Sequence, residues 1–375
     1  MVAIGSLSID MALPSLPAAA DDLGARPESM QLTVTLFLAA FALAQLVHGP
    51  LSDRVGRRRV LLGGLAVYAL GGLACWAAPT ARLLVAGRLL QALGAGSGPV
   101  VGRAVVRDLY EPSEAARILG YMGTAMALTP ILAPIVGGLV HVAFGWRAVY
   151  LVLAACGAVF LGVAALLVPE TNRQRDRGRL ATSTAELLTD RGFLGYTLVV
   201  ALMFGGQFAF ISGSSFVLIE VLGVTPDVYG LCFGLVAFGI MTGSFLAARF
   251  VPRVGIDGLI RAATCLGAAA GGLMAGLAWA RIWTVPAVIG PMYAFAVGVG
   301  VVLPTAVAGA IGPFPRTAGL ASAVLGFLQL TAAAGYGILI GRFYDGTPVP
   351  MAVAVAAAGV AAAGATRLRG GSRAR

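Results

Sequence analysis

The stretch that decides the fold is "GPLSDRVGRRRVLLGG", which runs from Gly49 to Gly64. Residues 53–59 hold four arginines and one aspartate, whereas the segments on both sides carry almost no charge. A short, strongly basic connection between two long apolar runs is typical of a loop that joins two membrane helices on the cytoplasmic side. We therefore expect a chain that crosses a membrane several times.

The composition supports this expectation. Hydrophobic residues make up 59% of the 375 and charged residues only 11%, whereas a soluble domain carries about a quarter charged residues. Apolar runs of roughly 20 residues recur, which is the length that spans a bilayer as a helix. Because the runs are continuous rather than alternating, they predict helices and not the strands of a barrel. The four cysteines lie inside these runs without C-x-x-C spacing, so core packing is expected for them.

The apolar runs predict twelve membrane spans. They cover residues 2–17, 31–51, 60–79, 83–106, 117–140, 148–168, 194–217, 229–249, 259–280, 284–308, 318–341 and 349–366. Nineteen arginines fall in the loops and the tail of one side and five on the opposite side. Positive charge marks the cytoplasmic side, so both termini are expected there. The arginines that give the net charge of +10 lie mostly on this side of the membrane. We therefore attribute the charge to topology and expect no nucleic-acid partner.

The predicted fold class is an all-α membrane protein with twelve transmembrane helices in two six-helix bundles. The longest cytoplasmic connection divides the chain into residues 1–168, a central loop at 169–192, and residues 193–375 with a short tail. "GSFLAARFVPRVG", from Gly243, echoes the opening motif, with Ala247 where the aspartate would stand. Two similar halves suit a transporter that rocks about a central site. The first span starts at Met1 with no charged segment before it, so the true start is expected upstream.

Three blocks of sequence carry a resemblance to the major facilitator superfamily. The loop between spans two and three resembles its signature through Gly49, Asp53, Arg54, Gly56, Arg57 and Arg58. "RLLQALGAGSG", from Arg88, resembles the fourth-helix motif R-x-x-Q-G-x-G-A, with Leu93 near the expected glycine. "APIVGG", at 133–138, resembles the fifth-helix antiporter motif G-P-x-x-G-G, with Ala133 in place of the first glycine.

Further stretches narrow the resemblance. "SIDMALPSLP", "RDLY" and "GWRAVY" are similar to the Bcr/CflA group of drug:proton antiporters, which handles bicyclomycin, phenicols and other drugs. The resemblance implies that Asp53 and the loop arginines latch the two bundles together in the outward-open state, with Arg57 paired to Asp108. Gly49 is expected to allow close helix approach, and Gly56 to supply the backbone freedom of a tight turn. The alternative is an arginine anchor that only fixes topology.

Asp10 is the one carboxylate deep inside a predicted span, and such residues are functional candidates. It lies about 10 Å inside the outer boundary and Arg88 lies at roughly 7–8 Å, so the two side chains are at similar depth. A pairing between them, direct or across a cavity, is allowed. Asp10 is then either a proton acceptor that loads outside and releases inside, or a permanently ionised partner of Arg88. Pro14 has no N–H to donate to the carbonyl of Asp10.

Span five and four glutamines complete the candidate residues. Pro130 and Pro134 remove backbone hydrogen bonds, and Gly137 and Gly138 allow close packing. The resemblance implies that this motif shapes the cavity and blocks leakage, and the alternative is packing alone. Glutamines inside apolar spans suit a pocket for drug-like amphiphiles; they are Gln45, Gln91, Gln207 and Gln329.

The expected function is proton-driven efflux of small drug-like compounds across the bacterial inner membrane, by a protein that acts as a monomer. No cofactor is expected beyond the proton gradient, and no G-x-x-x-x-G-K-[ST] motif for ATP is present. A proton-coupled importer of sugars or organic acids on the same fold is the main alternative. A membrane enzyme is disfavoured because the spans offer no cluster of acids and histidines, and a non-transporting receptor remains open.

Overall fold

The computed structural model describes residues 1–171, 189–314 and 318–366. The regular elements in these ranges are helices, so the predicted all-α class is confirmed. The chain divides into two compact units, Met1–Arg177 with Val224–Gly234, and Gly178–Gly223 with Leu235–Arg375. The division at 168, 169–192 and 193 stays a prediction. Most of its central loop (172–188), Arg316 and the tail from 367 lie outside the described residues.

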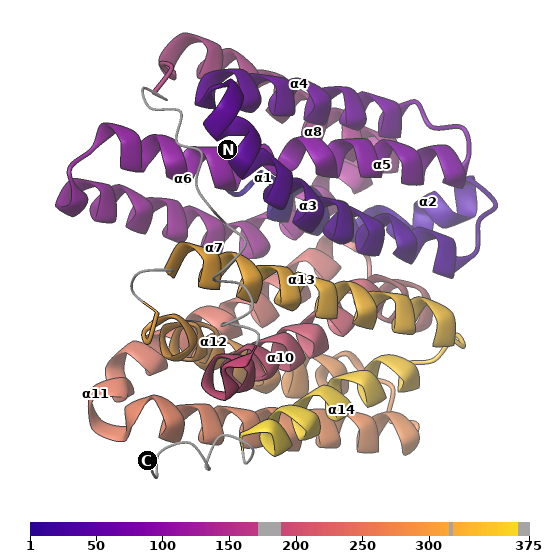
Figure 1. Ribbon diagram of the computed structural model, residues 1–375. Coiled ribbons are helices and arrows are strands. Elements are labelled where there is room, and N and C mark those ends of the chain that lie inside the picture. Colours follow the sequence, from indigo (N-terminus) through magenta and orange to yellow (C-terminus); the bar gives the residue numbers. More distant parts are fainter. Residues whose placement is uncertain (172–188, 315–317, 367–375) are drawn as a thin grey trace. The chain divides into compact units, whose positions relative to one another are not determined.

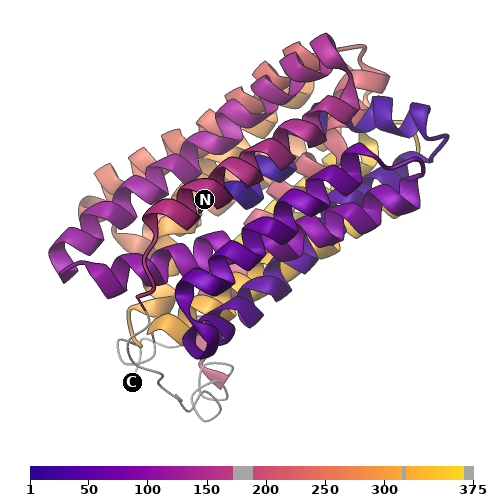
Figure 2. The same cartoon turned by 90° about the horizontal axis from the view of Figure 1, so that it is seen from above.

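The first unit begins with a broken helix and continues with long ones (Figure 1). Its elements are α1 (Ile4–Asp10), the 3₁₀ turn η1 (Leu13–Ser15), α2 (Leu16–Asp22), α3 (Pro27–Val55), α4 (Arg57–Trp76), α5 (Ala81–Ala95), α6 (Ser97–Leu109), α7 (Pro112–Phe144) and α8 (Trp146–Leu167). α4 packs against α5 and α8, and α3 packs against α5. The indigo and purple helices run alongside one another (Figure 2).

The second unit is built around α10. Its elements are α10 (Arg191–Ser215), the π-helix η2 (Phe216–Val221), most of α11 (Pro226–Trp279), α12 (Val285–Ile311), α13 (Ala318–Phe343) and α14 (Val349–Ala365). α10 packs against α12, α13 and α14. The π-helix continues α10 past the predicted end of its span at residue 217.

Local sequence sets several helix ends. The side chain of Thr80 accepts a hydrogen bond from the N–H of Leu83, and that of Asp190 accepts one from Phe193, so both cap a helix start. Proline stands in the first turn of α3, α7 and α12, where its missing N–H costs nothing. Gly145, with φ +82°, separates α7 from α8.

Nine helices in the described ranges are long and apolar enough to cross a membrane, and α14 is a shorter apolar helix. The twelve predicted spans are nevertheless all helical. α11 holds both the eighth and the ninth span, α14 holds the twelfth, and the first is divided among α1, η1 and α2.

Two predicted details are corrected by the structure. The first span is not one continuous helix, because α1 ends at Asp10 and a 3₁₀ turn containing Pro14 follows. The segment 250–258, which the sequence predicts to be a loop between the eighth and ninth spans, is also largely helical. Gly255, with φ +75°, alone makes the turn between the two spans. A positive φ is accessible to glycine without strain, so one residue suffices there.

Candidate functional site

The turn between α3 and α4 consists of a single residue, Gly56. Its φ of +117° is a conformation that residues with a side chain rarely adopt. A Cβ atom at this position would also press against the carboxylate of Glu170. The backbone angle therefore requires glycine, whereas the flexible side chain of Glu170 can move aside.

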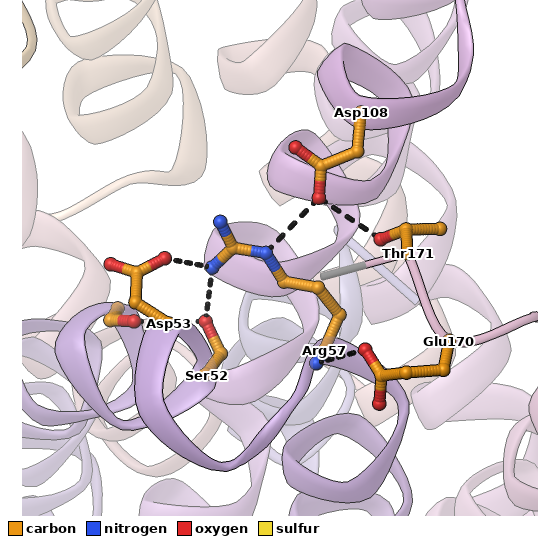
Figure 3. A network of polar contacts seen from close by, with 7 residues as sticks. Ser52, Asp53, Arg57, Asp108, Glu170 and Thr171 are labelled. Atoms are coloured by element: carbon orange, nitrogen blue, oxygen red, sulfur yellow. Dashed lines mark hydrogen bonds and ion pairs between the residues drawn. The ribbon is translucent and has the colours of Figure 1, made fainter. Parts of the chain in front are cut away.

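Arg57, the first residue of α4, lies at the centre of a polar network (Figure 3). Its Nη1 is 2.5 Å from Asp53 Oδ1 and 2.5 Å from Ser52 Oγ, and its Nε is 3.2 Å from Asp108 Oδ2. The side chain of Arg57 is only 14% exposed, so its contacts are better shielded than those of an ordinary surface ion pair. The structure thus brings together Asp53, Arg57 and Asp108 within one unit.

Besides Ser52, sequence reasoning missed two members of this network. The N–H of Arg57 donates to Glu170 Oε1 over 2.8 Å, and Thr171 Oγ1 donates to Asp108 Oδ2 over 2.9 Å. Both residues follow α8 in "PET", and the only signal was an acid and a hydroxyl directly after a span. Their partners lie 113 and 63 residues away, a separation that periodicity does not resolve.

The remaining residues of the loop motif have separate positions. Arg58 Nη2 donates to the carbonyl of Ala165 over 2.7 Å, and Arg54 is exposed. A Cβ at Gly49 would meet Val100 Cγ1 at 3.7 Å, which is an ordinary contact. The expectation that Gly49 allows close helix approach is therefore wrong; its carbonyl instead accepts a hydrogen bond from Ser52 Oγ.

Asp10 is the last residue of α1 and is buried, with 5% exposure. Among the described residues, its side chain has no hydrogen bond and no ion pair. The next turn is irregular: Ala12 donates to Ile9 and Ser15 donates to Ala12. A buried carboxyl without a partner in the described part of the chain thus stands at a break in the helix.

Arg88, in α5, is also buried, with 1% exposure. Its Nη1 donates to the carbonyl of Ser8 over 3.0 Å and to Gln91 Oε1 over 2.7 Å. The guanidinium carbon lies 4.2 Å from the centre of the Phe37 ring, a cation–π contact. Its Nε and Nη2 find no partner among the described residues.

Asp10 and Arg88 are not directly paired. Arg88 instead contacts α1 through the carbonyl of Ser8, whose hydroxyl lies 2.6 Å from that of Tyr68 on α4. The hydrogen bond from Arg88 goes to a backbone oxygen two residues before Asp10, so the direct pair that the sequence allowed is not formed. A pairing across a cavity stays a prediction.

The fifth-helix motif seats α7 against the break beside Asp10. A Cβ at Gly137 would collide with the carbonyl of Met11, the residue after Asp10, and one at Gly138 would collide with that of Pro226. α7 continues through Pro130 and Pro134 without ending. The glycines are thus needed for backbone contact, and the role in coupling stays a prediction.

The four candidate glutamines divide evenly between the two units. Gln45 and Gln91 belong to the first, Gln207 and Gln329 to the second. Gln91 and Gln207 are buried, and Oε1 of Gln207 has no partner among the described residues, whereas Gln45 and Gln329 are half-buried. A shared cavity stays a prediction. In the described part of the chain, no three His, Cys, Asp or Glu side chains gather as metal ligands would.

A second polar cluster forms where the last residue of α2, Asp22, meets the first residues of α8, Trp146 and Arg147. Arg147 Nη1 is 2.5 Å from Asp22 Oδ2, and Trp146 Nε1 donates to the same oxygen over 3.2 Å. The hydrogen bond from Arg147 lowers the pKa of Asp22 below its usual value, and that from Trp146 adds to the effect. The cluster joins α2 to the start of α8.

Comparisons with known proteins agree with this architecture. Residues 1–338 match the family described as Major Facilitator Superfamily. The chain is 32% identical to multidrug resistance protein D of Escherichia coli K12 over 88% of its own length and 83% of that protein. It is 30% identical to a bicyclomycin resistance protein homolog of Haemophilus influenzae over 92% of its length and 87% of that protein.

A solved structure shares the fold. The crystal structure of a D-xylose–proton symporter superimposes with a TM-score of 0.75 at 16% identity, covering 96% of this chain and 94% of the other. With a matching family signature, two relatives at 30% identity or more and this fold, the chain is a member of the major facilitator superfamily and, within it, of the Bcr/CflA group.

Proposed function

We propose that this protein exports small drug-like organic compounds across the bacterial inner membrane in exchange for protons. Two relatives with more than four-fifths of their length matched are named for resistance to several drugs or to bicyclomycin, which favours efflux. The shared fold with a sugar–proton symporter is neutral on direction, because one fold serves both. Import of a sugar or organic acid is the second candidate.

The observation that carries the proposal is the buried carboxyl of Asp10 at the break in the first span, which has no partner among residues 1–171, 189–314 and 318–366. An ionised carboxylate in such a place is costly unless something compensates it. A carboxyl that carries a proton from one side to the other is neutral for part of each cycle, and during that part it avoids this cost. Arg88, two of whose nitrogens lack partners here, is the cation that would stabilise the ionised form when the helices rearrange.

The loop network is the proposed latch of this cycle. Arg57 bridges Asp53 and Asp108 at the shared end of α3, α4 and α6, where the basic loop indicates the cytoplasmic side. In this proposal the network holds the cytoplasmic ends in one arrangement while the outer side is open. Two bundles, at 1–168 and 193–375, then alternate about a central cavity lined in part by Gln45, Gln91, Gln207 and Gln329. The protein acts as a monomer with its termini in the cytoplasm.

Drug susceptibility of a sensitive bacterium tests the proposal. Cells that express the chain are expected to tolerate higher concentrations of at least one drug, and Asp10→Asn is expected to remove this protection because it cannot carry a proton. Asp21→Asn, an exposed aspartate on α2, is the matched control and should protect like the wild type.

Inverted vesicles then decide the direction of transport. An exported drug added to energised vesicles should dissipate the interior-acid pH gradient in wild type and not in Asp10→Asn. Full protection by Asp10→Asn at equal expression would remove Asp10 from coupling. A sugar or organic acid that moves protons where no drug does would favour the importer.

A further inference from the structure

The loop network receives residues from four parts of the first unit. Ser52 and Asp53 come from the end of α3, Arg57 from the start of α4, and Asp108 from the end of α6. The fourth part is the segment after α8, which brings Glu170 and Thr171 (Figure 3). This last segment is the start of the connection between the two halves of the chain.

We propose that Glu170 and Thr171 are positioning residues: they fix the directions of Arg57 and Asp108, so that the latch closes only while the start of the central connection is docked. The inference rests on the proposed efflux function for its effect on transport. The docking itself is a property of this chain that does not depend on the substrate.

Glu170 acts on Arg57 through the backbone. α4 begins after a glycine, so the preceding residue offers no side chain to accept its first N–H groups. Glu170 arrives from another helix and accepts the N–H of Arg57, and its negative charge suits a helix N-terminus. The same carboxylate also occupies the space where a Cβ of residue 56 would lie. The glycine turn thus leaves room for the side chain that caps α4.

Thr171 acts on Asp108. It is buried, with 9% exposure, and donates to Oδ2, the same oxygen that accepts from Arg57 Nε. The carboxylate of Asp108 is therefore held from two sides. Without the hydroxyl, the one contact left to Asp108 among the described residues would be with the long and rotatable side chain of Arg57, which carries a larger entropic cost of ordering.

The docking segment has a fixed base. Arg58 Nη2 donates to the carbonyl of Ala165 in the last turn of α8, and Glu170 follows the end of that helix by only three residues. Arg58 thus binds the end of α8, and its neighbour Arg57 binds the segment that follows this helix. A displacement of Glu170 and Thr171 would consequently reach Arg57 and Asp108 directly.

Hydrogen exchange tests the cap on the full chain in detergent, without a drug. The amide of Arg57 should exchange about fivefold faster in Glu170→Ala, the change expected from loss of a helix cap. Glu170→Gln, which keeps an acceptor oxygen, should give an intermediate rate. Glu111→Gln is the control, because this glutamate precedes α7 and caps nothing. Equal exchange in Glu170→Ala and Glu111→Gln would overturn the proposal.

A double-mutant cycle tests Thr171. Thr171→Val removes the hydroxyl at nearly constant shape and should lower the protective drug concentration about threefold, in keeping with one hydrogen bond, while Thr171→Ser should restore it. In an Asp108→Ala background, which lacks both acceptor oxygens, Thr171→Val should add no further loss. Equal losses in both backgrounds, or no difference between valine and serine, would show that Thr171 does not act through Asp108.

The two measurements separate this inference from the efflux proposal. If wild type protects against no drug, the efflux proposal fails, while faster exchange in Glu170→Ala still supports the docking. If wild type protects and the exchange of Glu170→Ala matches that of Glu111→Gln, efflux stands and the docking is wrong. Glu170 is exposed, so its substitution leaves the packed interior of the unit unchanged.

Discussion

At the scale of single residues, Arg88 is a buried charge that uses only part of its hydrogen-bonding capacity in the described part of the chain. Its guanidinium is 1% exposed, yet Nε and Nη2 lack partners among the described residues. An unsatisfied buried polar group costs about 1–3 kcal/mol, which offsets what its two hydrogen bonds contribute. The residue is thus a poor structural support in this state.

We expect Arg88→Met to abolish drug protection. Its free energy of unfolding should stay within about 1 kcal/mol of the wild-type value, because the lost hydrogen bonds are balanced by the removed desolvation cost. Thermal melting of the purified protein and drug susceptibility measure the two effects. Arg88→Lys keeps the charge and serves as the control for partial function. A melting temperature far below that of wild type would instead mark Arg88 as structural.

The pair of Asp22 and Arg147 predicts a response to acid. The pKa of Asp22 is lowered in the folded protein, chiefly by the hydrogen bond from Arg147. Its contribution to stability is therefore present above the unfolded pKa of about 4 and is lost as the pH falls through the lower folded value. Asp22→Asn should melt below wild type at pH 7, and the difference should shrink towards pH 3. A difference that stays constant with pH would contradict this.

At the scale of helices, the contact between α7 and the first span depends on Gly137. A methyl group there would meet the carbonyl of Met11, and backbone atoms cannot move aside as a flexible side chain can. Gly137→Ala should destabilise the protein by about 1–3 kcal/mol, the usual cost of overpacking. It should also reduce drug protection, because Met11 adjoins Asp10.

Gly162 on α8 provides the matched control. Nothing lies within 4 Å of a Cβ at this position, so Gly162→Ala should be neutral or stabilise by up to about 1 kcal/mol through helix propensity. Thermal melting of both variants in the same detergent makes the comparison. Equal effects of the two substitutions would show that the close contact at Gly137 carries no special cost.

At the scale of the whole molecule, the arginine bias predicts orientation. With nineteen loop and tail arginines on one side, we expect residue 59 to face the cytoplasm and residue 79 the outside. Single cysteines at these positions, with the four natural cysteines replaced, report this directly. Pro79→Cys should react with a membrane-impermeant maleimide in intact cells, and Arg59→Cys only after permeabilisation. The reverse labelling pattern would show that the topology is opposite to the predicted one and that the loop network faces the outside.

The sequence by itself determined the number and the order of the spans, the need for backbone freedom at Gly56 and the family, whereas the structure shortened the predicted loop at 52–59 to that one residue. These features are local: the length of an apolar run, the freedom of glycine and the position of charge are read along the chain. It also supplied Asp10, Arg88 and the residues of the loop motif as candidates.

Only the tertiary structure decided which of these residues meet. It left Asp10 and Arg88 unpaired, because Arg88 donates instead to the backbone carbonyl of Ser8 and to the side chain of Gln91. It brought Glu170 and Thr171 to the start of α4 and the end of α6, across 113 and 63 residues. Such contacts depend on how helices pack, and that information lies in the combined surfaces of the helices rather than in the period of any one segment.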